Sequence, residues 1–266
     1  MLTYLGLGLV IGIILALTGA GGGILAVPLL IFGAHQSVAQ AGPIGLLAVG
    51  MAAALGAVLG LRAGTVRYRA VLLISATGML LSPIGLWLAH RIDNRWLTVL
   101  FAFVLMFVAY RTFHQAGKLP GDNPHAKENQ PPCVRDTERG RFIWTTTCAR
   151  ALAISGGVAG ILSGLLGVGG GFVMVPALRH FTDLAMQSVV ATSLAVIALV
   201  SVTGVVSSAV AGSLNWTVAI PFATGALVGM LGGGIVSTHL AGPYLQKGFA
   251  IVSGLVALGL LAKAMM

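Results

Sequence analysis

The chain has 266 residues, of which 57% are hydrophobic and only 8% are charged, and its mean hydropathy is +0.98. Soluble domains carry about 25% charged residues, so this composition excludes a soluble fold and predicts a protein embedded in lipid. The net charge is +9. Its basic residues lie at the ends of apolar segments and in one central loop, which is typical of membrane orientation signals and argues against a nucleic-acid partner.

The first half of the chain contains four apolar segments, each close to the length of about 20 residues that spans a bilayer as a helix. No Asp, Glu, Lys or Arg precedes Arg62. The segments are apolar on every face, which predicts helices rather than the alternating strands of a membrane barrel. They cover residues 4–32, 38–61, 70–90 and 96–113.

A polar segment at residues 114–149 separates the two halves, and its proline and charge content predicts a solvated linker. It holds both cysteines of the chain, Cys133 and Cys148. If the linker is cytoplasmic, we expect reduced thiols there. The cysteines lack the spacing of a metal site, and we expect neither a metal nor another cofactor.

Four further apolar segments follow the linker, and no charged residue lies between Asp183 and Lys247. The spans therefore offer no chain of buried carboxylates of the kind that relays protons in many pumps. The motifs HExxH and GxSxG are also missing, and we expect no enzymatic activity. The four segments cover residues 150–178, 187–210, 217–238 and 244–264.

The two halves are related by an internal repeat. Residues 19–30 read GAGGGILAVPLL and residues 167–178 read GVGGGFVMVPAL. The register continues from Gln36-Ser37-Val38 to Gln187-Ser188-Val189. We therefore predict an all-α membrane protein of about eight transmembrane helices in two homologous four-helix repeats. The repeats are residues 1–113 and 150–266, and residues 114–149 join them.

Lys and Arg residues predict the orientation. With eight spans, both termini and the linker share one side, which carries eleven Lys and Arg residues against four on the other. The richer side is expected in the cytoplasm of a bacterial cell, with the spans in the inner membrane. Four spans per half predict parallel repeats. In the alternative, the first segment of each half is a re-entrant hairpin, which would invert the halves and place the linker outside; the charge count argues against it.

Runs of glycine interrupt the first segment of each half in mid-membrane. Three consecutive glycines should break a helix, and backbone freed at this depth must line a cavity or be buried. Its N–H groups would bind an anion, with Pro28 and Pro176 as hinges. Alternatively the glycines are packing residues, as we infer for the rows Gly156, Gly160, Gly164 and Gly225, Gly229, Gly233. The glycines predicted to bind are Gly19, Gly21, Gly22, Gly23, Gly167, Gly169, Gly170 and Gly171.

Polar side chains that could complete an anion site follow each glycine run. Gln36 occurs in the first half, and Gln187, Thr192 and Ser193 occur in the matching stretch of the second. We predict that they line the site beside the glycines. The alternative is that the hydroxyls bond the carbonyls of their own helix.

The repeated G-x-G-G-G motif with its Val-Pro pair resembles the TauE/SafE family of sulfite-exporter-like membrane permeases. The stretch from Gln187 to Leu194 is the more specific match, whereas the first half departs from it at residues 40–43. The resemblance implies secondary transport of sulfite or organosulfonate anions, usually as export from the cytoplasm. Import of a sulfur oxyanion, or a scaffold without transport, stays open as an alternative, as does the oligomeric state.

Overall fold

The computed structural model of the protein describes residues 1–34, 36–116, 133, 145–212, 214–240 and 243–265. The regular secondary structure of the described residues consists of α-helices and one 3-10 helix, with a single isolated bridge between Cys133 and Thr182. Most of the linker that was predicted to be solvated, residues 117–132 and 134–144, lies outside these ranges. An all-helical fold is thus confirmed for the part of the chain that the structure describes.

The helices follow one another in the same order in both halves. The first half contains α1 (Leu2–Thr18), the 3-10 helix η1 (Gly19–Leu25), α2 (Ala26–Gly33), α3 (Val38–Arg62), α4 (Tyr68–Arg91) and α5 (Asn94–Ala116). The second contains α6 (Thr146–Leu166), α7 (Gly171–Phe181), α8 (Met186–Val210), α9 (Trp216–Leu240) and α10 (Pro243–Met265).

Among the described residues, six helices are long and apolar enough to cross a membrane, namely α3, α4, α5, α6, α8 and α9. Large apolar side chains on their outer faces are well exposed, including Leu72 and Leu80 on α4 and Phe103 on α5. Apolar surface on this scale belongs against lipid rather than water. The chain is therefore a multi-pass membrane protein, although the eight predicted spans are not what the helices form.

Glycine rows bring pairs of helices into direct backbone contact. A Cβ on Gly8 or Gly12 of α1 would overlap the carbonyl of Phe222 or Ala226 on α9. Residue numbers rise together along both helices, so α1 and α9 are parallel. The packing role predicted for the rows Gly156, Gly160, Gly164 and Gly225, Gly229, Gly233 is confirmed.

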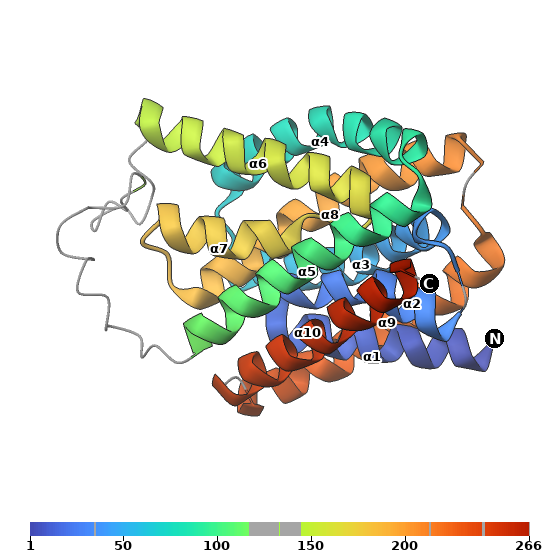
Figure 1. Ribbon diagram of the computed structural model, residues 1–266. Coiled ribbons are helices and arrows are strands. Elements are labelled where there is room, and N and C mark those ends of the chain that lie inside the picture. Colours follow the sequence, from blue (N-terminus) through green and yellow to red (C-terminus); the bar gives the residue numbers. More distant parts are fainter. Residues whose placement is uncertain (35, 117–132, 134–144, 213, 241–242, 266) are drawn as a thin grey trace.

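The rows on α6 pack on α4 in the same way, with Gly156 against Ile74 and Gly160 against Gly78, so these two helices are also parallel. At the centre of the bundle, α3 packs along α8 in the opposite sense. Gly50 lies against Ser201 and Gly60 lies against Ala191, so the residue numbers rise in one helix as they fall in the other. The α3–α8 pair forms the core around which the other elements are placed (Figure 1).

The first segment of each half turns back on itself instead of crossing as one broken helix. A Cβ on Gly22 would lie 2.6 Å from the nitrogen of Leu15, and one on Gly33 would lie 2.7 Å from a methyl group of Leu7, so α2 runs back along α1. Likewise a Cβ on Gly170 would lie 2.5 Å from the carbonyl oxygen of Ala159, so α7 begins beside the middle of α6. These segments are hairpins, which corrects the prediction of spanning first helices.

The hairpins change the relation between the halves. Each half contributes one hairpin and three further helices, so the chain ends each half on the side opposite to the one where it began. In Figure 1 both chain ends lie at the right, which we call the terminal end, while α5 ends and α6 begins at the left, the linker end. The halves are therefore antiparallel, and the prediction that the termini and the linker share one side is wrong.

Candidate anion-binding site

The two glycine runs have different backbone conformations. In the first half, residues 19–25 form a 3-10 helix that passes directly into α2, with the N–H of Ala26 donating to the carbonyl of Gly23. In the second half, α6 ends at Gly167, and Gly167, Gly169 and Gly170 adopt positive φ values of 70°, 77° and 65°. Such a turn strongly favours glycine. Only the second run leaves helical geometry altogether.

The two runs meet in the middle of the bundle. A Cβ on Gly23 would lie 3.3 Å from the carbonyl oxygen of Val168 and 2.9 Å from a methyl group of Val49. Val49 is the twelfth of the 25 residues of α3, and Ile197, which contacts Gly169, is the twelfth of the 25 residues of α8. The hairpins thus enter from opposite ends and touch at the mid-depth of the central pair.

The start of α7 presents hydrogen-bond donors at this point. Gly170 is its N-cap and has no side chain to cap the helix, while its carbonyl accepts from the N–H groups of Val173 and Met174 at 3.1 and 3.3 Å. The first N–H groups of an α-helix have no partner in the preceding turn, and the helix dipole adds partial positive charge there. This terminus is suited to hold an anion.

Ser201 lies beside this terminus, although the sequence pattern did not single it out. It is 2% exposed, and its hydroxyl has no hydrogen-bond partner among the described residues. Its Oγ lies 3.3 Å from the position that a Cβ on Gly169 would occupy. One signal was available in the sequence: Ser201 follows Val189 by twelve residues, as Gly50 follows Val38, so the two residues that face each other occupy equivalent places.

Ser193 is a predicted site residue that the structure places in line with this region. It is fully buried, its hydroxyl has no partner among the described residues, and it lies on α8 eight residues before Ser201. Positions i, i+4 and i+8 lie on roughly one face of a helix, so Ser193 and Ser201 share the side of α8 that includes Ile197. Ser193 lies closer to the linker end.

The other predicted polar side chains do not reach the glycine runs. Gln36 lies in the connection after α2, where its amide donates to the carbonyl of Ala34. Gln187 is exposed in the first turn of α8. The Thr192 hydroxyl accepts from the backbone N–H of Arg67 at 3.3 Å, which ties the α3–α4 connection to α8. Because the hairpins fold back, residues shortly after each run return to the ends of the bundle.

Pro28 and Pro176 both lie inside helices rather than at the turns. Pro28 is the third residue of α2, and Pro176 is the sixth residue of α7. A proline at the sixth position removes an N–H that would otherwise donate to the carbonyl of Phe172. The hydrogen-bond ladder of α7 is thereby weakened one and a half turns from the glycines, which leaves the hinge prediction open.

A small cavity adjoins Gly167 on the side of the terminal end. It is lined by residues from the start of α3, the end of α4, the start of α5 and the end of α6, including Val38, Ala89, Leu97 and Gly164. Its volume of about 20 Å³ accommodates roughly one water molecule. A sulfur oxyanion is larger than this volume.

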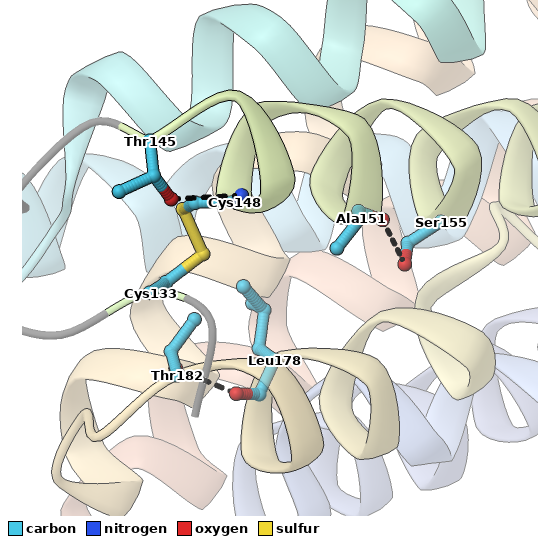
Figure 2. Close-up of a disulfide and its surroundings, with 7 residues drawn as sticks. All are labelled: Cys133, Thr145, Cys148, Ala151, Ser155, Leu178 and Thr182. Atoms are coloured by element: carbon cyan, nitrogen blue, oxygen red, sulfur yellow. Dashed lines mark hydrogen bonds between the residues drawn. A yellow bond between two sulfur atoms is a disulfide. The ribbon is translucent and has the colours of Figure 1, made fainter. Parts of the chain in front are cut away.

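The cysteines form a disulfide in the structure, which differs from the thiols expected for a cytoplasmic linker. Figure 2 shows Cys133 bonded to Cys148 in the first turn of α6, where Thr145 caps the helix by accepting from the N–H of Cys148 at 3.2 Å. The N–H of Cys133 donates to the carbonyl of Phe181 at the end of α7. Both sulfur-bearing residues are fully buried and their Cα atoms are 5.0 Å apart, a separation that permits the bond.

Within the described residues, no group of three or more His, Cys, Asp or Glu side chains could hold a metal ion. The region around the glycine runs offers instead the N–H groups at the start of α7 and the hydroxyl of Ser201. This arrangement can bind an anion of small size, and it carries no group suited to acid or base chemistry.

Comparison with known proteins supports a transport role. The family model described as "Sulfite exporter TauE/SafE" matches residues 4–260. The "Probable membrane transporter protein YunE" of Bacillus subtilis (strain 168) is 29% identical over 233 residues, covering 84% of this chain and 83% of that protein. A "Probable membrane transporter protein" of Xylella fastidiosa (strain 9a5c) is 30% identical over 240 residues, covering 88% of this chain and 83% of that protein.

A second Xylella fastidiosa protein of the same description (strain Temecula1 / ATCC 700964) is 27% identical over 246 residues, covering 91% of this chain and 86% of that protein. No solved structure matches the chain. The family model spans nearly all of the sequence, including both glycine runs and the central α3–α8 pair. The chain therefore belongs to the sulfite exporter TauE/SafE family of membrane transporters.

Proposed function

We propose that this protein is a secondary transporter that exports sulfite or a related organosulfur anion across the bacterial inner membrane. The observation that carries the proposal is the meeting of the two glycine runs at mid-depth, with Gly23 beside Val168. In this proposal the anion is held by backbone N–H groups at the start of α7, with Ser193 on the route along α8. Membership of the family supports a transport function, and the identity of the anion as a sulfur compound is the element of the proposal to be tested.

The antiparallel arrangement of the halves supports an alternating-access mechanism. Hairpins that enter from opposite ends and meet at one site are common in transporters with inverted repeats, where the substrate lies at the repeat interface. Each hairpin can then control access from its own end.

The second glycine run is the stronger contributor to the site. Residues 19–25 keep 3-10 hydrogen bonds, and the N–H of Ala26 is already paired with the carbonyl of Gly23. The turn at residues 167–170 has positive φ at three glycines and an uncapped helix after it. We infer that Gly169, Gly170 and Gly171 bind the anion and that Gly23 of the first run forms the opposing wall, whereas Gly22 packs against Leu15 of α1.

The basic residues support a cytoplasmic position for the linker end. By the helix ends that they adjoin in sequence, three Lys and Arg residues belong to the terminal end: Arg91, Arg95 and Lys263. The other twelve of the fifteen belong to the linker end, five of them between α5 and α6. This asymmetry exceeds the one expected for eight spans, and it supports an orientation with the termini on the outer side.

Export agrees with the energetics of the membrane. Moving one negative charge outward is favoured by an inside-negative potential by about 2.3 kcal/mol for each 100 mV. Such a driving force needs no buried carboxylate to carry protons, and none of the six apolar spans shows an Asp or Glu near the glycine runs.

The proposal is tested with purified protein in liposomes, by following sulfite efflux under an imposed voltage. The informative variant is Gly169→Ala, whose Cβ would lie 2.9 Å from Ile197 and 3.3 Å from the Ser201 Oγ. Gly212→Ala is the matched control, because Gly212 also has positive φ, at 66°, but has open space around it. Both variants bear similar backbone strain, of order 1 kcal/mol.

We expect sulfite flux in the wild type and in Gly212→Ala, and flux lower by about tenfold or more in Gly169→Ala, since a loss of 1.4 kcal/mol in binding is tenfold. Equal flux in the two variants would show that the anion passes elsewhere. Wild-type protein that carries sulfate or chloride but not sulfite would refute the sulfur-anion assignment. Uptake that is fastest with a voltage favouring entry would favour the importer reading.

A further inference from the structure

Ser201 is one of several buried serines whose hydroxyl makes no hydrogen bond among the described residues, and its hydroxyl lies beside Gly169 of the second glycine run. Ser155 and Thr98 donate to the carbonyl four residues earlier, at 2.7 Å in each case. That bond is the usual fate of a serine or threonine inside a membrane helix. The Ser201 hydroxyl is buried and has no partner among the described residues. A buried hydroxyl without a partner is destabilising.

The surroundings of Ser201 direct its hydroxyl to the gap between the central helices and the second glycine run. Its Oγ is 3.3 Å from the Cβ position of Gly169 on one side and 3.3 Å from that of Gly50 on the other. Both neighbours are glycines, so the hydroxyl faces backbone rather than side chains. The uncapped start of α7 lies on the Gly169 side.

Gly50 and Ser201 also occupy the point where the two halves face each other. They are twelve residues after Val38 and Val189, which are equivalent in the sequence repeat, and they are in contact. A site at this point occupies an equivalent position relative to the hairpin of each half. The first half supplies glycine there and the second supplies a hydroxyl, so only the second half contributes a polar side chain at this contact.

We propose that the Ser201 hydroxyl donates a hydrogen bond to one oxygen of the transported oxyanion, while the first N–H groups of α7 bind the others. This inference rests on the proposed function and names a side-chain ligand for its site. An anion at this point would accept hydrogen bonds from the Ser201 hydroxyl and from the first N–H groups of α7 at once. Hydrogen bonds to charged groups are the stronger class, so a hydroxyl at this point strengthens the binding of an anion.

The test compares Ser201→Ala with Ser253→Ala in liposomes. Ser253 is a matched control, since it is a fully buried serine of α10 whose hydroxyl also has no partner among the described residues. Its neighbour Gly254 faces Ala109 of α5, away from the glycine runs. Initial rates of sulfite efflux give KM and maximal rate separately, and thermal unfolding checks that each variant is folded.

We expect Ser201→Ala to raise the KM for sulfite about tenfold or more, as removal of a bond to a charged group does, with a folded protein and an unchanged Ser253→Ala variant. An unchanged KM in Ser201→Ala, with sulfite carried by the wild type, would overturn the role of Ser201 and leave the proposed function intact. An absence of sulfite flux in the wild type, with Gly212→Ala and Gly169→Ala equally inactive, would overturn both.

Discussion

Gly229 and Gly232 lie three residues apart on α9 and have opposite surroundings. A Cβ on Gly229 would overlap the carbonyl oxygen of Leu9 and lie 3.0 Å from the Cα of Gly12, whereas a Cβ on Gly232 meets nothing within 4 Å. Gly229→Val should therefore force α1 and α9 apart, at a cost of about 1–3 kcal/mol. Gly232→Val should be tolerated. Thermal unfolding of the two variants in detergent measures the difference, and equal midpoints would contradict the contact.

Thr192 provides a prediction about structure rather than transport. Its hydroxyl accepts from the N–H of Arg67, so Thr192→Val keeps the shape of the side chain but leaves that N–H without its acceptor. We expect a loss of about 1 kcal/mol in stability, with the KM for the anion unchanged. A raised KM with unchanged stability would instead return Thr192 to the site, as the sequence pattern suggested.

The residue scale also shows where sequence reasoning stops. The glycines at 167–171 were found because consecutive glycines are visible in any sequence and weaken a helix. Ser201 was not found, because a serine among Val and Ala is common and its missing backbone bond is a matter of rotamer. Gln187 was selected because it recurs in both halves, yet it is exposed at the start of α8. A residue that recurs in both halves shows that the halves are related in sequence. Whether its side chain lies beside the glycine run depends on the direction that the chain takes after the run.

At the scale of elements, the sequence did not determine whether the chain continues across the membrane or turns back after each glycine run. An apolar stretch of 29 residues at residues 4–32 fits a long broken span and a hairpin equally well. The choice depends on contacts distant in sequence, such as Gly42 and Gly45 of α3 against Gly167. Packing of the glycine rows could be predicted, since spacing of four residues places them on one face. The partner of each row could not.

Pro176 tests whether α7 bends during transport. Pro176→Ala restores an N–H that can donate to the carbonyl of Phe172, which stabilises a helix interior by up to about 3 kcal/mol. If α7 flexes at this point in each cycle, the variant should unfold at a higher temperature and transport more slowly, with KM little changed. The midpoint of thermal unfolding and the maximal rate are the two readouts. A more stable variant with full transport rate would remove Pro176 from the list of hinges.

At the scale of the whole molecule, sidedness follows from which end carries the basic residues. Because the halves are antiparallel, the chain termini and the linker lie at opposite ends of the bundle. The linker end carries twelve of the fifteen Lys and Arg residues. We predict that a reporter fused after Met266 lies outside: alkaline phosphatase, which needs oxidation, should be active there, and a fluorescent protein that folds only in the cytoplasm should be dark. The opposite pair of results would invert the molecule.

The redox state of the two cysteines provides a second test of which end faces the cytoplasm. Cytoplasmic cysteines are kept reduced, so in the proposed orientation Cys133 and Cys148 are thiols in growing cells and form the bond of Figure 2 only on oxidation. Acid quenching of cells, followed by denaturation and reaction with a bulky maleimide, should therefore shift the protein by two labels. Cys133→Ser should shift by one label. Unlabelled wild-type protein that becomes reactive only after reduction would place the linker end, with its basic residues, in an oxidising compartment and the termini in the cytoplasm.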